Sequence, residues 1–330
     1  MSDHRPAVIL ANLGTPEQPT PRAVRKYLRE FLSDRRIIEM SPLLWRPILE
    51  LAILPVRGKA SAHKYQMVWT DEGSPLMVYS KAQVAAVQEA LGDEATVHLA
   101  MRYGEPALEK VVKEISASGT NRILLVPLYP QYSATSAGTV HDELARIIRT
   151  MRNIPEIRWI RSFETDPQYI HALAHALRTH WETTGTPDPA RGERVVLSYH
   201  SIPQKGVDDG DPYPSECEAT TAAVAEVLAQ PKELFLTTYQ SKFGPAEWVG
   251  PQTIDTVTQL GGEGCPRVDV ICPGFVSDCL ETLEEIELLN REAYAAAGGG
   301  QFHYVPWGNA AREWTDALGS LVRTHLSGWL

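Results

Sequence analysis

Hydrophobic residues along the chain gather into short, nearly continuous runs that alternate with longer amphipathic segments. In residues 123–126 and 268–271, for example, most positions are apolar. Such runs are typical of parallel strands that are covered on both faces. We predict strands at residues 8–13, 95–101, 122–128, 157–162, 194–199, 234–239, 267–272 and 302–305.

The segments between these runs have the apolar spacing and the end signals of helices. We predict helices at residues 81–91, 106–116, 140–151, 167–181, 218–228, 278–297 and 310–326. Strand and helix alternate from end to end, which predicts an α/β fold with parallel sheets. The same order of elements occurs in two halves, which meet near residues 153–155.

From this order we predict two similar Rossmann-like domains, each a parallel sheet of about four strands flanked by helices. The first covers residues 1–152 and the second residues 153–308, and helix 309–330 packs on the first. Two such domains would form a cleft along the carboxyl ends of their strands, where α/β proteins bind ligands. We therefore expect the active site in that cleft.

Composition narrows the class of protein. Of the 330 residues, 43% are hydrophobic and 22% charged, which is ordinary for a globular protein. The net charge of -10 and the lack of a block of Lys and Arg argue against a nucleic-acid partner. Segment 37–56 is rich in Leu and Ile, but its charged residues and three prolines exclude a membrane-spanning helix. The apolar run 7–13 ends in a turn and is read as a strand, not as a signal peptide.

Several common functional motifs are missing. The sequence has no G-x-G-x-x-G after a strand, no Walker A loop and no G-x-S-x-G elbow. Its four cysteines form no C-x-x-C pair, so we expect buried free thiols and not a metal cluster. His171, His175 and His180 share one predicted helix without the other residues of a zinc motif, and we expect them to face solvent.

Two strand ends carry a more informative pattern. His200 ends the strand 194–199, and the strand 267–272 leads through a short turn into a helix. In that helix Asp278, Glu281 and Glu285 are spaced at i, i+3 and i+7, which places their carboxylates on one face. Either feature alone has an ordinary structural explanation. Together they offer a base that titrates near neutral pH and weak oxygen and nitrogen ligands for a divalent metal.

These two segments, and several others in the same order, resemble the ferrochelatase family over nearly the whole chain. The segments are Leu197-Ser-Tyr-His-Ser-Ile-Pro203, Cys272-Pro-Gly-Phe-Val-Ser-Asp-Cys-Leu-Glu281, Val8-Ile-Leu-Ala-Asn-Leu-Gly-Thr-Pro16, Gly73-Ser-Pro75, Met101-Arg-Tyr103, Tyr129-Pro-Gln-Tyr-Ser133, Asp211-Pro-Tyr-Pro214 and Tyr239-Gln-Ser-Lys-Phe-Gly-Pro-Ala-Glu-Trp248. The resemblance implies an enzyme of haem biosynthesis that inserts Fe²⁺ into protoporphyrin IX and releases two protons. Both the porphyrin and Fe²⁺ are then substrates.

The resemblance also implies roles for single residues. His200 matches the essential histidine, which accepts porphyrin protons and binds iron, and Glu281 matches its acidic partner. Asp278 and Glu285 resemble an acidic path for metal or protons. The residues that resemble the porphyrin-binding set are Leu13, Arg102, Tyr103, Ser133, Tyr213, Trp248 and Phe275. Of these, Arg102 and Tyr103 match residues that engage the propionates.

Some positions depart from the family pattern. Cys279 stands where many relatives have a histidine, and Leu289 stands where a further acid is expected. Ala134 and the end of the chain at Leu330 lead us to expect no [2Fe–2S] cluster. Relatives that act on coproporphyrin have Tyr in place of Leu13, so Leu13 and an apolar wall from segment 37–56 favour protoporphyrin.

Other expectations and alternatives remain open. We expect a cytoplasmic monomer, with weak contact between segment 37–56 and a membrane surface as an alternative to its role in the porphyrin pocket. A chelatase for coproporphyrin III, sirohydrochlorin or another tetrapyrrole is the alternative activity. A non-catalytic protein that binds porphyrin or metal is the alternative from another class.

Overall fold

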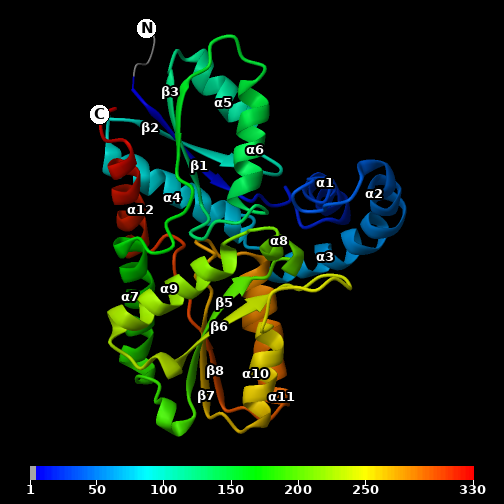
Figure 1. Cartoon of the computed structure of the whole chain (residues 1–330), viewed down its shortest axis with the longest axis vertical. Helices are drawn as coiled ribbons and strands as arrows, with labels where there is room; N and C mark the ends of the chain where they lie inside the picture. Colours follow the sequence, from blue (N-terminus) through cyan, green and yellow to red (C-terminus); the bar gives the residue numbers. More distant parts are fainter. Residues whose placement is uncertain (1–4) are drawn as a thin grey trace. The chain divides into compact units, whose positions relative to one another are not determined.

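Two parallel four-stranded sheets organise the chain in the computed structural model, which describes residues 5–330 (Figure 1). The first sheet has the order β2-β1-β3-β4 and the second the order β6-β5-β7-β8. The strands are β1 (Ala7–Asn12), β2 (Thr96–Met101), β3 (Arg122–Pro127), β4 (Glu156–Trp159), β5 (Arg194–His200), β6 (Phe235–Gln240), β7 (Arg267–Ile271) and β8 (Gln301–Tyr304). Each overlaps one of the eight predicted strands, and the predicted α/β fold class is confirmed.

Both sheets share one topology. In each, the first strand of the half is central, the second lies on one side of it, and the third and fourth lie on the other. The strand order therefore reverses between β1 and β3 in the first sheet, and between β5 and β7 in the second. Such switch points are where open α/β sheets bind ligands, just beyond the carboxyl ends of the strands.

The chain divides into two compact units. Unit 1 comprises the described part of Met1–Tyr129, together with Ala134–Arg161 and Leu318–Leu330, and unit 2 comprises Pro130–Ser133 and Ser162–Ala317. This division falls a few residues after the predicted boundary at 152. It also places the short segment Pro130–Ser133 with unit 2 and the last residues of the chain with unit 1.

Unit 1 contains helices on both sides of its sheet. They are α1 (Pro21–Phe31), α2 (Pro42–Ile48), the π-helix η1 (Leu49–Ile53), α3 (Leu54–Val68), α4 (Pro75–Leu91), α5 (Leu108–Ala117) and α6 (Ala137–Ile148). The helix α12 (Arg312–His325) begins in unit 2 and ends in unit 1. The sequence analysis did not predict α1, α2 or α3, and it used Pro42 and Pro55 only to exclude a membrane-spanning helix. Both lie in the first turn of a helix, where proline is tolerated.

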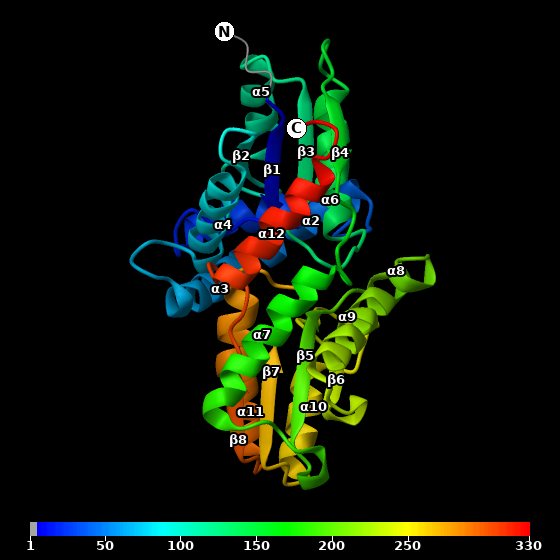
Figure 2. The ribbon, with the colours of Figure 1, turned by 90° about the vertical axis from the view of Figure 1, so that its left-hand side faces the viewer.

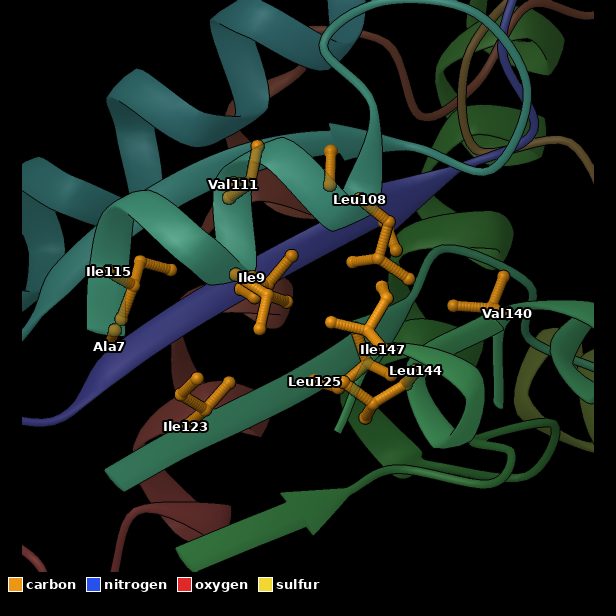
Figure 3. Packing of buried hydrophobic residues seen from close by; sticks show 13 residues of the cluster. Ala7, Ile9, Leu108, Val111, Ile115, Ile123, Leu125, Val140, Leu144 and Ile147 are labelled. Carbon is orange, nitrogen blue, oxygen red and sulfur yellow. The ribbon is translucent and has the colours of Figure 1, made fainter. Parts of the chain in front are cut away.

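The core of unit 1 shows why its strands are apolar throughout. Alternate residues of β1, including Ala7 and Ile9, pack against α5 and α6 together with Ile123 and Leu125 of β3 (Figure 3). The other residues of β1, such as Val8, are also fully buried, so the sheet is covered on both faces.

Unit 2 is layered in the same way. Its helices are α7 (Pro167–Thr184), α8 (Gln204–Asp208), α9 (Tyr213–Leu228), α10 (Thr253–Gly262), the π-helix η4 (Glu281–Asn290) and α11 (Arg291–Ala296), with short 3₁₀ turns η2 (Pro189–Arg191) and η3 (Lys232–Leu234). α7 lies on one face of the sheet, and α10, η4 and α11 pack on the other (Figures 1 and 2). α8 and α10 were not predicted from the sequence.

Segment 37–56 forms α2, η1 and the start of α3. One side packs on α1 in a small cluster that includes the buried Leu49 and Leu54. The other side leaves Leu43 87% and Leu51 82% exposed. Within residues 5–330, no helix is both long enough and apolar enough to cross a membrane.

Candidate active site

His200 is the last residue of β5, at the switch point of the second sheet. The strand before it is buried, while His200 itself is half-buried, so the imidazole is held in place but remains accessible. Its Nδ1 lies 2.7 Å from the carbonyl oxygen of Ser201. Because a carbonyl only accepts hydrogen bonds, Nδ1 carries the proton and Nε2 of the neutral ring keeps its lone pair. His200 is therefore oriented as a proton acceptor or metal ligand.

The neighbouring strand β7 leads through residues 272–280 into η4. Within this connection the Asp278 carboxylate accepts hydrogen bonds from Thr282 Oγ1 (2.7 Å), Asn309 Nδ2 (2.6 Å) and the Tyr304 hydroxyl. Its backbone N–H donates to Asn309 Oδ1 at 2.7 Å. Asp278 thus precedes the helix and ties it to the segment after β8. Its role in an acidic path stays a prediction, but its carboxylate already has three donors.

The helix that carries the other two acids is a π-helix and not the α-helix that the i, i+3, i+7 spacing assumed. Its i→i+5 pairing changes the face on which each residue lies. Glu281 and Glu285 are both half-buried, and the Glu285 carboxylate accepts a hydrogen bond from the Ser241 backbone N–H at 2.7 Å and another from the Ser241 hydroxyl. Ser241 adopts a left-handed backbone (φ 68°), which turns its N–H toward the acid.

Electrostatics link these groups. Burial raises the pKa of Glu285, while the Ser241 hydrogen bonds and the electrostatic influence of His200 lower it, and the negative charge of Glu281 raises it further. Geometry places the groups together: His200 is the register partner of Gln240, whose side chain donates to the Glu281 carbonyl, and the next residue, Ser241, holds the Glu285 carboxylate. The structure therefore brings together the histidine and two of the three acids that the sequence singled out.

Cys279, which replaces a histidine of many relatives, is buried beside this group. Burial raises the pKa of its thiol well above the usual value, and the charge of Glu281, to which the thiol hydrogen-bonds, raises it further. A protonated thiol is a poor metal ligand. The surroundings of Cys279 therefore favour the protonated thiol over the thiolate that a metal would need.

Four predicted pocket residues belong to unit 2. The Phe275 ring centroid lies 6.4 Å from that of His200, so Phe275 adjoins the histidine. The Trp248 indole Nε1 is buried without a hydrogen-bond partner within the described residues. Ser133 Oγ donates to Asp211 at 2.9 Å, which helps to join Pro130–Ser133 to unit 2. Tyr213 is buried at the start of α9.

The remaining three predicted residues belong to unit 1. Leu13 follows β1 and is half-buried, and its carbonyl accepts the backbone N–H of Tyr103 at 2.9 Å. A side chain at Gly14 would collide with the Tyr103 carbonyl at 1.8 Å, so glycine is required for this approach. Leu13 and Tyr103 therefore lie at the same edge of the first sheet.

Arg102 and Tyr103 are already paired within unit 1. The Arg102 guanidinium forms a buried ion pair with Asp34 and donates from Nε to the Thr139 carbonyl at 2.9 Å. The Tyr103 hydroxyl donates to the same Asp34 carboxylate at 2.9 Å. Their role in holding propionates stays a prediction, and the sequence analysis did not anticipate Asp34.

Comparison with known protein families identifies the family of this chain. A ferrochelatase family model matches residues 5–326, nearly the whole chain. The chain belongs to the ferrochelatase family. Membership makes it a tetrapyrrole metal chelatase, and the roles of His200, Glu281 and Glu285 stay predictions.

Solved structures support the fold of this ferrochelatase-family chain. SirB from Bacillus subtilis with Fe³⁺ has a TM-score of 0.56 at 12% identity, over 98% of this chain and 96% of that one. The sirohydrochlorin chelatase SirB from Bacillus subtilis subspecies spizizenii in complex with cobalt has a TM-score of 0.55 at 12% identity, over 97% and 95% of the two chains. At this identity the likeness concerns the fold alone.

Two residues next to the acids were quoted in the family segments but received no role. Gln240 ends β6 and Ser241 follows it, and both contact the first two turns of η4. Their signal in the sequence was their position after a strand beside the switch point, which is where α/β proteins place functional side chains.

Proposed function

We propose that the chain is a protoporphyrin ferrochelatase, which inserts Fe²⁺ into protoporphyrin IX to give protohaem and two protons. The observation that carries the proposal is the grouping of His200 with Glu281 and Glu285 through Gln240 and Ser241 at the switch point of the second sheet. Metal insertion needs a base for the pyrrole protons and weak ligands for the incoming ion. This group supplies both.

His200, Glu285 and Glu281 have different roles in this reaction. His200 Nε2 accepts a pyrrole N–H proton, because Nδ1 is committed to the Ser201 carbonyl. Glu285, whose pKa is raised by burial, is suited to take the proton onward. The His200 imidazole and the Glu281 carboxylate hold the substrate iron as mixed nitrogen and oxygen ligands, which bind Fe²⁺ without enclosing it.

Leu13 and segment 37–56 support protoporphyrin as the porphyrin. Leu13 is an apolar side chain at an edge where relatives that act on coproporphyrin have Tyr. Leu43, Leu44, Leu51 and Val56 are between 66% and 87% exposed, a surface of the kind that an apolar macrocycle or a membrane can cover. We retain the porphyrin wall as the first role of this segment and contact with a membrane surface as its alternative.

The buried cysteines support the expectation that no iron–sulfur cluster is held. All four cysteines are buried and free. Burial raises the pKa of the thiols of Cys217, Cys272 and Cys279 well above its usual value. Cluster ligands are thiolates, which these surroundings disfavour. The monomeric state and the cytoplasmic location stay predictions.

An anaerobic assay tests the activity. Purified protein is mixed with Fe²⁺ and either protoporphyrin IX or coproporphyrin III, and loss of free-porphyrin fluorescence is followed. We expect faster turnover of protoporphyrin, and turnover at least about a hundredfold lower in His200→Ala. His171→Ala, at an exposed histidine of α7, is the matched control. Faster turnover of coproporphyrin would change the substrate, and tight porphyrin binding without turnover would favour a non-catalytic binding protein.

A further inference from the structure

A group of side chains with the geometry to hold a metal ion lies in unit 2, and it shares no residue with the candidate active site. His180, Asp269 and His303 each offer one ligand atom, and these atoms lie within 4.8 Å of one another. They come from three elements, α7, β7 and β8. α7 lies across the face of the sheet that contains these strands (Figure 2), and Asp269 is the register partner of His303.

Asp269 is the centre of the group. Its side chain is fully buried and points to the face of the sheet opposite Val268 and Val270, which pack in the core with α10 and α11. Oδ1 accepts from His303 Nδ1 at 2.8 Å, and the Arg267 guanidinium donates to both carboxylate oxygens at 2.8 and 2.7 Å. The Trp181 indole N–H donates to Oδ2 at 2.8 Å. The carboxylate is thereby fixed in one orientation.

His180 is the member that the folded chain leaves unsatisfied. The sequence analysis expected it to face solvent with His171 and His175, and that expectation was wrong, because only 18% of its side chain is exposed. His171 and His175 are exposed, as expected. The buried Nε2 of His180 has no hydrogen-bond partner and lies 3.7 Å from Asp269 Oδ1, outside hydrogen-bond range.

A buried polar atom without a partner calls for an explanation, and a bound ion is one of the ordinary ones. Here the unpaired nitrogen lies beside a second imidazole, at a ring-centroid distance of 4.9 Å. Both imidazoles keep some exposure, 18% and 25%, so an ion can reach them.

We propose that His180, Asp269 and His303 form a second metal site for a first-row divalent cation such as Zn²⁺ or Co²⁺. Two imidazole nitrogens and one carboxylate oxygen are a donor set for these ions and not for Mg²⁺ or Ca²⁺, which take oxygen ligands. Binding at His303 Nδ1 moves the ring proton from Nδ1 to Nε2 and breaks its hydrogen bond to Asp269. Arg267 keeps its contacts with Asp269 and offsets the carboxylate charge, which limits the affinity of the site.

The bound ion would join α7 to β7 and β8 and so stabilise unit 2 by mass action. This inference does not depend on iron insertion. It is tested in a variant whose active site lacks the proposed metal ligands, so that metal bound there cannot be mistaken for metal at the new site. The protein for the test is the full chain carrying His200→Ala and Glu281→Gln, stripped of metal with a chelator. Co²⁺ binding is followed by visible absorption, Zn²⁺ binding by calorimetry, and the thermal midpoint is measured with and without Zn²⁺.

We expect one equivalent of Zn²⁺ to bind and to raise the thermal midpoint. Adding His180→Gln or His303→Gln should weaken binding at least about tenfold and remove the thermal shift. Adding His175→Gln, one turn away on the exposed side of α7, should change neither. Binding that persists at full strength in both His180→Gln and His303→Gln, or its loss in His175→Gln, would overturn the assignment. Absence of any metal binding in the parent variant His200→Ala/Glu281→Gln would also overturn the assignment. None of these outcomes bears on the chelatase activity of the wild type.

Discussion

The side chain of Gln240 donates a hydrogen bond from Nε2 to the backbone carbonyl oxygen of Glu281 at 2.8 Å. Gln240 is the last residue of β6 and is buried, and its Oε1 accepts from Ser198 Oγ of β5 at 2.7 Å. A rigid pair of strands therefore holds the first turn of η4. Because Glu281 must be positioned closely to act as the metal ligand that we propose, we expect this contact to make Gln240 a positioning residue for Glu281.

Replacing Gln240 with Leu should displace Glu281 without removing any reacting group. We expect kcat for iron insertion to fall about ten- to hundredfold with little change in KM for the porphyrin. Steady-state kinetics with protoporphyrin measure both constants. Gln259→Leu, at an exposed position of α10, is the control. A loss confined to KM would assign Gln240 to porphyrin binding instead.

Glu281→Gln should remove the carboxylate and keep the shape of the side chain. We expect turnover to fall at least about a hundredfold, because a proton acceptor or metal ligand is lost. The thermal midpoint should stay close to that of the wild type, since Glu281 is only half-buried. Glu292→Gln, at an exposed position of α11, is the matched control. A near-normal rate in Glu281→Gln would take this residue out of the mechanism.

Glu285 should make stability depend on pH. Burial raises its pKa above the ordinary value of 4.5, so between those two pKa values the folded state binds more protons than the unfolded state. The free energy of unfolding therefore falls as pH rises through that window. Glu285→Gln should remove this fall, so that the wild type loses stability relative to the variant from pH 4.5 upward. Denaturant unfolding of both proteins at a series of pH values measures the difference, and parallel curves would contradict the raised pKa.

Arg102 should prove important for stability, because its partner Asp34 is buried with it at 13% and 9% side-chain exposure. Arg102→Met leaves that carboxylate without its counter-charge and should cost about 3–5 kcal/mol of unfolding free energy. Adding Asp34→Asn should recover part of the loss. Arg146→Met, whose side chain is 53% exposed, should cost no more than about 1 kcal/mol. Weak porphyrin binding without loss of stability in Arg102→Met would instead support its role toward propionates.

Segment 37–56 contains two leucines, two positions apart in η1, of which Leu49 is buried and Leu51 is exposed. Leu51→Ser, at 82% exposure, should change the unfolding free energy by less than about 0.5 kcal/mol. Leu49→Ala, at 1% exposure, should cost about 2–5 kcal/mol. If the exposed side is a wall for the porphyrin, Leu51→Ser raises KM for protoporphyrin. If it contacts a membrane, the same variant sediments less with phospholipid vesicles and KM is unchanged.

The sequence by itself determined the α/β class and the position of every strand. Parallel strands that are buried on both faces must be apolar along most of their length, so a run such as 123–126 is readable without tertiary information. The end of β5 at His200 was readable for the same reason. The family segments then pointed to Glu281 and its neighbours, since their order along the chain is itself sequence information.

Only the tertiary structure determined the contacts between residues that are far apart in the sequence. The π-helical form of η4, the three donors around Asp278 and the pairing of Arg102 with Asp34 each depend on partners that no local pattern specifies. His180 shows the physical reason most directly. Its helix pattern is compatible with an exposed position, and only the packing of α7 on β7 and β8 buries its imidazole beside Asp269 and His303.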